Sequence, residues 1–224
     1  MLTLEDLKWD DYLQFINEPK HLVNPVRGIC LFDSRFLEIV TSTPWYLIPI
    51  AYFPPITYLL YLSSQENSTL IQLLSFLGGM LWWTFSEYYL HRFFFHSEDS
   101  WLPNHPKVLA FHFMLHGVHH AYPMDRLRLV FPPIPGLAVH FVLILVPMSY
   151  IIPHPYLYGV ASGELFGYVL YDMIHYYLHH ATPKDPYFKD LKRYHMLHHY
   201  KQGTIGFGVS NKVWDFVFGS EIKY

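Results

Sequence analysis

The sequence predicts a single all-α domain that spans a membrane about four times and carries a helical cap outside the bilayer. Its 224 residues are 52% hydrophobic and 19% aromatic but only 15% charged, an oily composition for a soluble domain of this length. The apolar residues gather into stretches long enough to cross a bilayer core, which takes about 20 residues per helix. The polar segments next to these stretches are rich in histidine.

Two apolar stretches near the N-terminus, of which the first is free of charge and the second contains only Glu87, predict the first pair of spans. Residues 39–65 carry no charge, and within them we place a span at about 44–62, which its prolines should kink. The second span, at about 68–90, ends at the first histidine pair. The preceding segment, 1–43, begins with an acidic amphipathic stretch and lacks the basic end and apolar core of a cleaved signal peptide.

A second charge-free run predicts two further spans. No charged residue occurs from Leu129 to Gly163, and Pro147, Pro153 and Pro155 break this run into a predicted helical hairpin. The third and fourth spans then lie at about 132–152 and 155–177.

The basic residues predict the orientation. Of the 15 Lys and Arg, four precede the first span, four lie between the second and third, seven follow the fourth, and none lies in the two short turns. Because positive charge favours the cytosolic side, both termini and the middle loop should face the cytosol. The cap, formed by residues 91–131 and 178–224, should therefore be cytosolic.

Composition excludes several other classes. The chain has one cysteine, Cys30, so neither an internal disulfide nor a thiolate metal cluster can form. The net charge of −3 gives no case for nucleic-acid binding.

Twelve of the sixteen histidines form four compact clusters that border the predicted spans or lie in the cap. The clusters are HRFFFH (His91, His96), HFMLHGVHH (His112, His116, His119, His120), HYYLHH (His175, His179, His180) and HMLHH (His195, His198, His199). Neutral imidazole is a common metal ligand, and one metal rarely takes more than six donors. This number of histidines therefore predicts two metals.

Spacing within the clusters agrees with shared ligation. His175 and His179 are four residues apart, so on a helix both rings leave one face. His91 and His96 are five apart and would diverge on a regular α-helix, so we expect the helix to end or bend there. Glu87, one turn before His91, is a candidate to orient a ligand ring.

The chemistry of an all-histidine site favours redox iron over the alternatives. A structural zinc site is closed by four ligands, and hydrolytic zinc usually needs a carboxylate base, yet no HExxH motif is present. A membrane haem protein would need paired histidines deep in facing spans, and only His140 lies there. A membrane metal transporter would need ionisable residues along a path through the bilayer, for which Glu164 and His140 are too few.

Several longer motifs carry a resemblance to a known family. The chain contains WTFSEYYLHRFFFH, HFMLHGVHHAYPMDRLRLVFPP, LFGYVLYDMIHYYLHH, LKRYHMLHHY and GFGVSNKVWDFVFG. These blocks resemble the fatty acid 2-hydroxylases of the fatty acid hydroxylase and sterol desaturase superfamily, from about Asn24 to Gly219. The PMDxxRLVFPP and GFGVSxxxWDxVFG motifs lie outside the ligand clusters and favour this branch over a sterol-acting oxidase or a lipid desaturase.

The resemblance implies a specific set of site residues. Matching positions give the metal ligands His91, His96, His116, His119, His120, His175, His179, His195, His198 and His199. Four further residues are expected to hold the ligand rings in place without binding a metal themselves: His112, His180, Asp172 and Glu87. Glu164 departs from the family pattern, which has small residues at this point.

The resemblance also implies the activity. The expected enzyme is an endoplasmic reticulum monooxygenase that uses O2 to hydroxylate carbon 2 of the fatty acyl chains of sphingolipids and ceramides. Iron is the expected metal for activity, with zinc accepted by the same ligands. The HPGG motif of a fused cytochrome b5 domain does not occur. The chain should therefore be a short form that receives electrons from a separate cytochrome b5 and its reductase.

Overall fold

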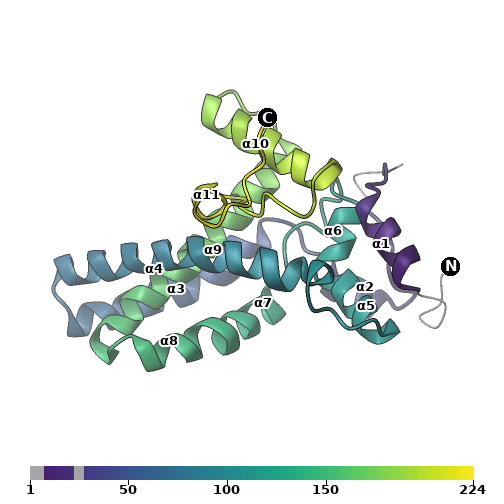
Figure 1. The fold of residues 1–224 in the computed structure, drawn as a ribbon. Helices are drawn as coiled ribbons and strands as arrows, with labels where there is room; N and C mark the ends of the chain where they lie inside the picture. The colour runs from purple at the N-terminus through teal and green to yellow at the C-terminus, as the bar shows by residue number, and fades with distance from the viewer. Residues whose placement is uncertain (1–7, 23–27) are drawn as a thin grey trace.

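The computed structural model describes residues 8–22 and 28–224, and every regular element within them is helical (Figure 1). This confirms the predicted all-α class. The helices, in chain order, are α1 (Trp9–Asn17), α2 (Arg35–Thr41), α3 (Leu47–Glu66), α4 (Thr69–Leu90), α5 (Pro106–His112), α6 (Val118–Ala121), α7 (Pro133–Val139), α8 (Val146–Ile151), α9 (His154–His180), α10 (Pro186–Tyr200) and α11 (Val213–Phe218).

Three stretches of the described chain are long and apolar enough to cross a membrane. They are Leu47–Glu66, Thr69–Phe95 and Pro133–Ile151. Side chains such as Leu81 and Phe141 are more than 60% exposed on these helices, as expected of surfaces that face lipid. The expected first three spans thus coincide with apolar helices.

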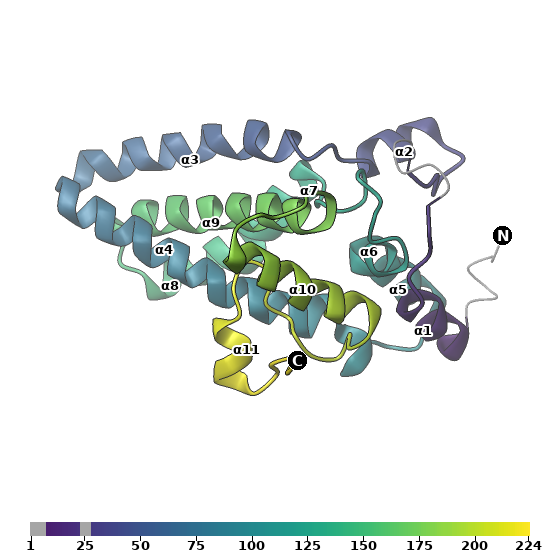
Figure 2. The same cartoon turned by 90° about the horizontal axis from the view of Figure 1, so that it is seen from above.

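The expected fourth span lies in α9, which has 27 residues but is not one of the three apolar stretches. It packs between α3 and α4, as Figure 2 shows. Its polar residues, including Glu164 and Asp172, are buried inside the bundle. Because α3 and α4 shield these residues from lipid, α9 has the length of a span without the composition of one.

Two glycines allow α4 and α9 to approach closely. A Cβ on Gly79 would lie 1.9 Å from the Val160 carbonyl oxygen, and one on Gly163 would lie 1.9 Å from that of Phe76. Small residues serve the same purpose where helices cross in membranes, because they allow backbone-to-backbone contact. The crossing fixes α9 against α4; α9 carries two of the expected metal ligands, and the turn that follows α4 carries two more.

The proline-rich run from Leu129 to Gly163 forms a helical hairpin, as predicted, but Pro147 does not break it. The helix preceding the turn runs through a π-helical turn at His140–Leu145 and continues past Pro147 to Ile151. The chain reverses at Ile152 and Pro153, and α9 begins with Pro155 in its first turn, where the missing N–H is not needed. The helical run is therefore broken once, at Ile152 and Pro153, and not at Pro147.

Both short interhelical turns lie at one end of the bundle, and the short helices α1, α2, α5 and α6 lie at the other (Figure 1). The side-chain amide of Asn67, between α3 and α4, donates to the carbonyl of Pro155 at the start of α9, which joins the two turns. All four histidine clusters lie at the opposite end, where the cap was predicted. The bundle thus brings the clusters together from segments far apart in the chain.

Candidate metal centre

The first cluster sits at the end of α4, where the helix widens into a π-helical turn over His91–Phe95 and ends at His96. The N–H of His96 bonds to the carbonyl of His91 at 3.0 Å, so residues five apart lie above one another. The two rings are 5.0 Å apart between centroids. The prediction that the helix ends or bends here is confirmed, since the helix widens and then ends, and the two rings come together.

The second cluster is also positioned by a π-helical turn. A π-helical turn over Phe113–Gly117 joins α5 to α6 and places His116, His119 and His120 inside the molecule. The third and fourth clusters lie on regular helix, near the ends of α9 and α10, where residues spaced by three or four share a face. Four different helical segments thus converge.

The convergent rings form two groups, all of them buried. The five-histidine set consists of His119, His175, His179, His195 and His199. The four-histidine set consists of His91, His96, His120 and His198. Within each set, ring nitrogens from every member lie within 4.8 Å of one another. The sets adjoin, since the rings of His120 and His199 are 4.3 Å apart.

His116 falls outside both groups but lies next to one of them. Its Nε2 is 3.2 Å from the Nε2 of His91 in the four-histidine set. Adding it brings together all ten positions that the resemblance implies as ligands, five around each centre.

The Nε2 atoms within each set come unusually close. The separations are 3.0 Å between His119 and His175, 2.9 Å between His179 and His195, and 3.0 Å between His96 and His198. Two nitrogens bound at right angles to one metal 2.0–2.1 Å away would lie about 3 Å apart. The spacing of the donors therefore fits shared metal ligation.

In three rings of the four-histidine set, the hydrogen bonds made by Nδ1 show that Nε2 carries a lone pair. Nδ1 of His91 faces the carbonyl oxygen of Phe207 at 2.5 Å, and Nδ1 of His198 faces that of Ile205 at 2.8 Å. Nδ1 of His96 faces Glu98 Oε1 at 3.0 Å. Since all three partners are acceptors, Nδ1 holds the proton of each neutral ring. Bare Nε2 atoms 3.0 Å apart repel one another unless a cation lies between them.

Burial keeps these rings neutral. Burial, with a smaller contribution from the neighbouring His96, lowers the pKa of His198 to about 3. The pKa values of His195 and His199 lie well below the usual range for the same reason, with the surrounding histidines adding to the effect. Neutral imidazole is the form that binds metal, so the site is prepared for ligation at neutral pH.

The carbonyls of Phe207 and Ile205 belong to a loop, residues 205–211, that two carboxylates hold in place. Asp215 accepts the N–H groups of Phe207 at 2.9 Å and Gly208 at 2.7 Å. Glu87 accepts those of Val209 at 2.8 Å and Ser210 at 2.7 Å. Glu87 was expected to orient a histidine ring directly, but it acts on the loop whose carbonyls orient the rings. Asp215 was not predicted as a site residue, although the GFGVSNKVWDFVFG motif contains it.

The other three residues expected to hold the ligand rings make no hydrogen bond to a ring of either set. His112 bonds to Tyr12, to the Phe95 carbonyl and to Glu98, none of them a ring of the two sets. Asp172 lies on α9 one turn before His175, and its Oδ2 has no hydrogen-bond partner among the described residues. The ring of His180 packs on Tyr176, 4.6 Å between centroids, outside both sets.

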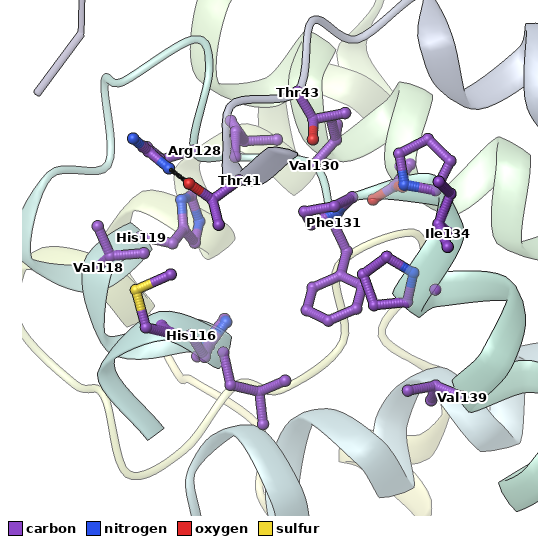
Figure 3. Close-up of a pocket in the computed structure, with 18 of the residues that line it drawn as sticks. Thr41, Thr43, His116, Val118, His119, Arg128, Val130, Phe131, Ile134 and Val139 are labelled. Atoms are coloured by element: carbon purple, nitrogen blue, oxygen red, sulfur yellow. Dashed lines mark hydrogen bonds between the residues drawn. The ribbon is translucent and has the colours of Figure 1, made fainter. Parts of the chain in front are cut away.

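A cavity of about 770 Å³ reaches the five-histidine set and His116. His116, His119 and His175 line it near the metal centre, and Figure 3 shows His116 and His119 on one side with Phe131, Ile134 and Val139 on the other. This volume lies within the range of small-molecule sites, about 300–1,000 Å³. Ile134 also lines the cavity. It lies on α7 and is 85% exposed on the outer surface of the molecule.

Helix α2 covers one side of this cavity. Arg128 lines the cavity, donates to Thr41 of α2 at 2.6 Å (Figure 3) and forms an ion pair with Glu38. On the same helix, Phe36 and Ile39 are both more than 70% exposed and also line the cavity. The arginine charge is therefore neutralised within the protein, and the rim of the cavity is apolar.

Comparison with known proteins agrees with this geometry. Residues 76–220 match the model of the family described as fatty acid hydroxylase. The ceramide very long chain fatty acid hydroxylase of Saccharomyces cerevisiae is 39% identical over 96% of this chain, and the dihydroceramide fatty acyl 2-hydroxylase of Arabidopsis thaliana is 40% identical over 94%. A solved structure described as full-length Scs7p, with only the hydroxylase domain visible, has a TM-score of 0.88 at 39% identity and covers 97% of this chain and 80% of its own.

The lengths of these relatives differ from that of this chain. The match spans 54% of the yeast protein and 86% of the Arabidopsis protein. The fatty acid 2-hydroxylase of Homo sapiens is 36% identical over 93% of this chain and 59% of its own length.

Proposed function

Because the chain belongs to the fatty acid hydroxylase family, we propose that it is an O2-dependent oxidoreductase that hydroxylates carbon 2 of fatty acyl chains in ceramides or other sphingolipids. The relatives named for ceramide and dihydroceramide acyl chains support this substrate class. The observation that carries the proposal is the placement of two adjoining buried histidine sets beside an apolar cavity whose wall includes His119 and His175 of the five-histidine set and His116.

The proposed ligands are the nine members of the two sets together with His116. Two iron ions held there would supply the activation of O2 and the removal of hydrogen from an unactivated carbon, and zinc would be accepted by the same nitrogens. The protein's own contribution is to hold ten neutral rings in fixed orientations and to keep water away from them. Burial of every ring and the braced loop at residues 205–211 serve these two purposes.

The proposed position of the substrate follows from the apolar helices. A lipid acyl chain would enter from the bilayer past Ile134 and the exposed side of α2, where the cavity wall is apolar. Carbon 2 would then lie beside His116, His119 and His175. Asp172, which also lines the cavity, has an unpaired oxygen available to the polar group adjoining carbon 2.

The proposed cellular setting rests on the sequence. We propose that both termini and the metal end face the cytosol, which the distribution of basic residues supports, and that the enzyme resides in the endoplasmic reticulum membrane, which the reaction class supports. Hydroxylation with O2 consumes two electrons per turnover. We propose cytochrome b5 and its reductase as their source.

Expression in a yeast strain that lacks its 2-hydroxylase tests the proposal. Three chains should be compared: the wild type, His119→Ala in the five-histidine set, and His154→Ala as a control. His154 lies at the far end of the bundle with its side chain 66% exposed. Mass spectrometry of the sphingolipids should find 2-hydroxy acyl chains with the wild type and the control, and none with His119→Ala.

Protein abundance in the membrane fraction must be equal for the comparison to hold. A wild-type chain that is present and metal-loaded but restores no 2-hydroxy acyl chains would refute the proposed substrate. Sterol intermediates in the same strain would then show whether the chain acts on the alternative substrate of the superfamily.

A further inference from the structure

A buried row of hydrogen bonds connects helix α1 to the four-histidine set. It runs from Tyr12 through His112 and Glu98 to His96. The Tyr12 and His112 side chains and the Glu98 carboxylate are each at least 95% buried. Of these residues, sequence analysis indicated only His96 and His112, and it predicted no connection to the N-terminal helix.

The direction of each hydrogen bond follows from the chemistry of the neighbouring atoms. Nε2 of His112 lies 2.8 Å from both the Phe95 carbonyl oxygen and Glu98 Oε2. Both atoms are acceptors, so Nε2 carries the ring proton; the N–H points at the carbonyl, and the carboxylate oxygen receives a more bent contact. Nδ1 of the same ring is then a bare acceptor.

Tyr12 supplies the donor that this acceptor needs. Its hydroxyl contacts Nδ1 of His112, and burial together with the nearby Glu98 charge raises the pKa of Tyr12, so the O–H keeps its proton. Gly117 leaves the space for this contact, because a Cβ there would lie 2.9 Å from the Tyr12 hydroxyl oxygen. The hydroxyl thus fixes which nitrogen of His112 faces Glu98.

Both oxygens of Glu98 face a histidine. Oε1 accepts the Nδ1–H of His96 at 3.0 Å, and Oε2 lies 2.8 Å from Nε2 of His112 in a charge–dipole contact rather than a regular hydrogen bond. The two contacts hold the carboxylate plane, and the carboxylate fixes both the tautomer and the tilt of the His96 ring. A carboxylate behind a ligating histidine also makes the metal-facing nitrogen more basic.

The geometry points to Glu98, His112 and Tyr12 as positioning residues that set the metal affinity of the four-histidine set through His96. This inference rests on the proposed metal centre. In the four-histidine set, the Nδ1 atoms of His91 and His198 face neutral backbone carbonyls, whereas that of His96 faces a carboxylate. The five-histidine set does not depend on this row of hydrogen bonds, which makes the effect of the row specific to one metal.

The test measures Zn²⁺ binding to the metal-free chain in detergent, by competition with a chromophoric chelator. Glu98→Gln keeps the size of the side chain but sets an amide N–H₂ against one of its two donors. We expect a 10- to 100-fold loss of affinity at one of the two metals and an unchanged second metal. Tyr12→Phe, two hydrogen bonds further away, should lower the same affinity by a smaller factor.

Glu221→Gln is the matched control, because it makes the same chemical change at an exposed carboxylate that belongs to neither histidine set. It should bind both metals as the wild type does. Retention of the second metal by Glu98→Gln separates a positioning role from a loss of fold, and Glu98→Asp should restore part of the affinity.

Three other outcomes would overturn either the positioning role of Glu98 or the metal centre on which it rests. Unchanged affinity for both metals in Glu98→Gln would overturn the assignment, and so would an equal loss at both metals. A wild-type chain that binds fewer than two Zn²⁺ would refute the proposed metal centre itself.

Discussion

Substitution of two adjacent glycines on α4 should have opposite effects on stability. Gly79 faces α9, and a Cβ there would lie 1.9 Å from the Val160 carbonyl oxygen and 2.8 Å from the Glu164 nitrogen. Gly78 is exposed, and a Cβ there would meet nothing within 4 Å. Gly78→Ala and Gly79→Ala therefore make the same chemical change one residue apart on the same helix.

The expected magnitudes follow from these distances. Alanine favours a helix over glycine by about 1 kcal/mol, and Gly78→Ala should gain up to this amount. At position 79 the contact must lengthen from 1.9 Å to 3.4 Å, the start of ordinary van der Waals contact. The neighbouring atom is backbone, so the helices themselves must separate. Overpacking costs about 1–3 kcal/mol, and the upper end applies because no side chain can rotate away, which leaves a net loss of about 2 kcal/mol.

Thermal unfolding of the purified chains in detergent measures the difference. For a chain of this length, about 2 kcal/mol corresponds to a fall in Tm of roughly 4–8 °C. Gly78→Ala should unfold at or slightly above the wild-type temperature. A Gly79→Ala chain as stable as Gly78→Ala would refute the close crossing of α4 and α9.

Three further predictions concern the metal centre and the cavity. Asp215→Asn should lower Zn²⁺ affinity at one metal about tenfold, since an amide N–H₂ would face a loop N–H that the carboxylate now accepts; equal binding by wild type and variant in a chelator competition would contradict the bracing role. Removal of metal with a chelator should lower Tm, because a ligand at 1,000 times its Kd stabilises the native state by about 4 kcal/mol; a Tm unaffected by the chelator would argue against a metal. Val139→Trp should fill part of the cavity and reduce 2-hydroxylation of long acyl chains more than of short ones, and an unchanged product distribution by mass spectrometry would place the acyl chain elsewhere.

The sequence predicted the features that depend on side-chain type and period. Charge-free stretches indicated the positions of α3, α4 and the helix that starts at Pro133. The histidine clusters, together with the family resemblance, identified the rings that the structure brings together in two sets. Histidine spacing even indicated a bend at His91, because a five-residue separation does not suit a regular α-helix.

The supporting contacts could not be predicted in the same way, because much of the support comes from the backbone. The acceptors behind His91 and His198 are the carbonyls of Phe207 and Ile205, and a carbonyl is present at every residue. Glu98 carries a side chain of the right type, yet its partner His112 becomes its neighbour only through the fold. Glu87 was chosen by its position one turn before a ligand, but its oxygens point to another segment.

Helix α9 shows why an expected span that carries metal ligands is not among the three apolar stretches. Its inward face carries Glu164, Asp172, His175 and His179, whose polar atoms would be costly in contact with lipid. They are tolerated because α3 and α4 flank the helix and because two glycines bring α4 against its backbone. Hydropathy measures whether a helix suits lipid on all sides, whereas α9 faces protein. The mean hydropathy of a helix inside the bundle therefore falls with each metal ligand or other polar residue that the helix carries.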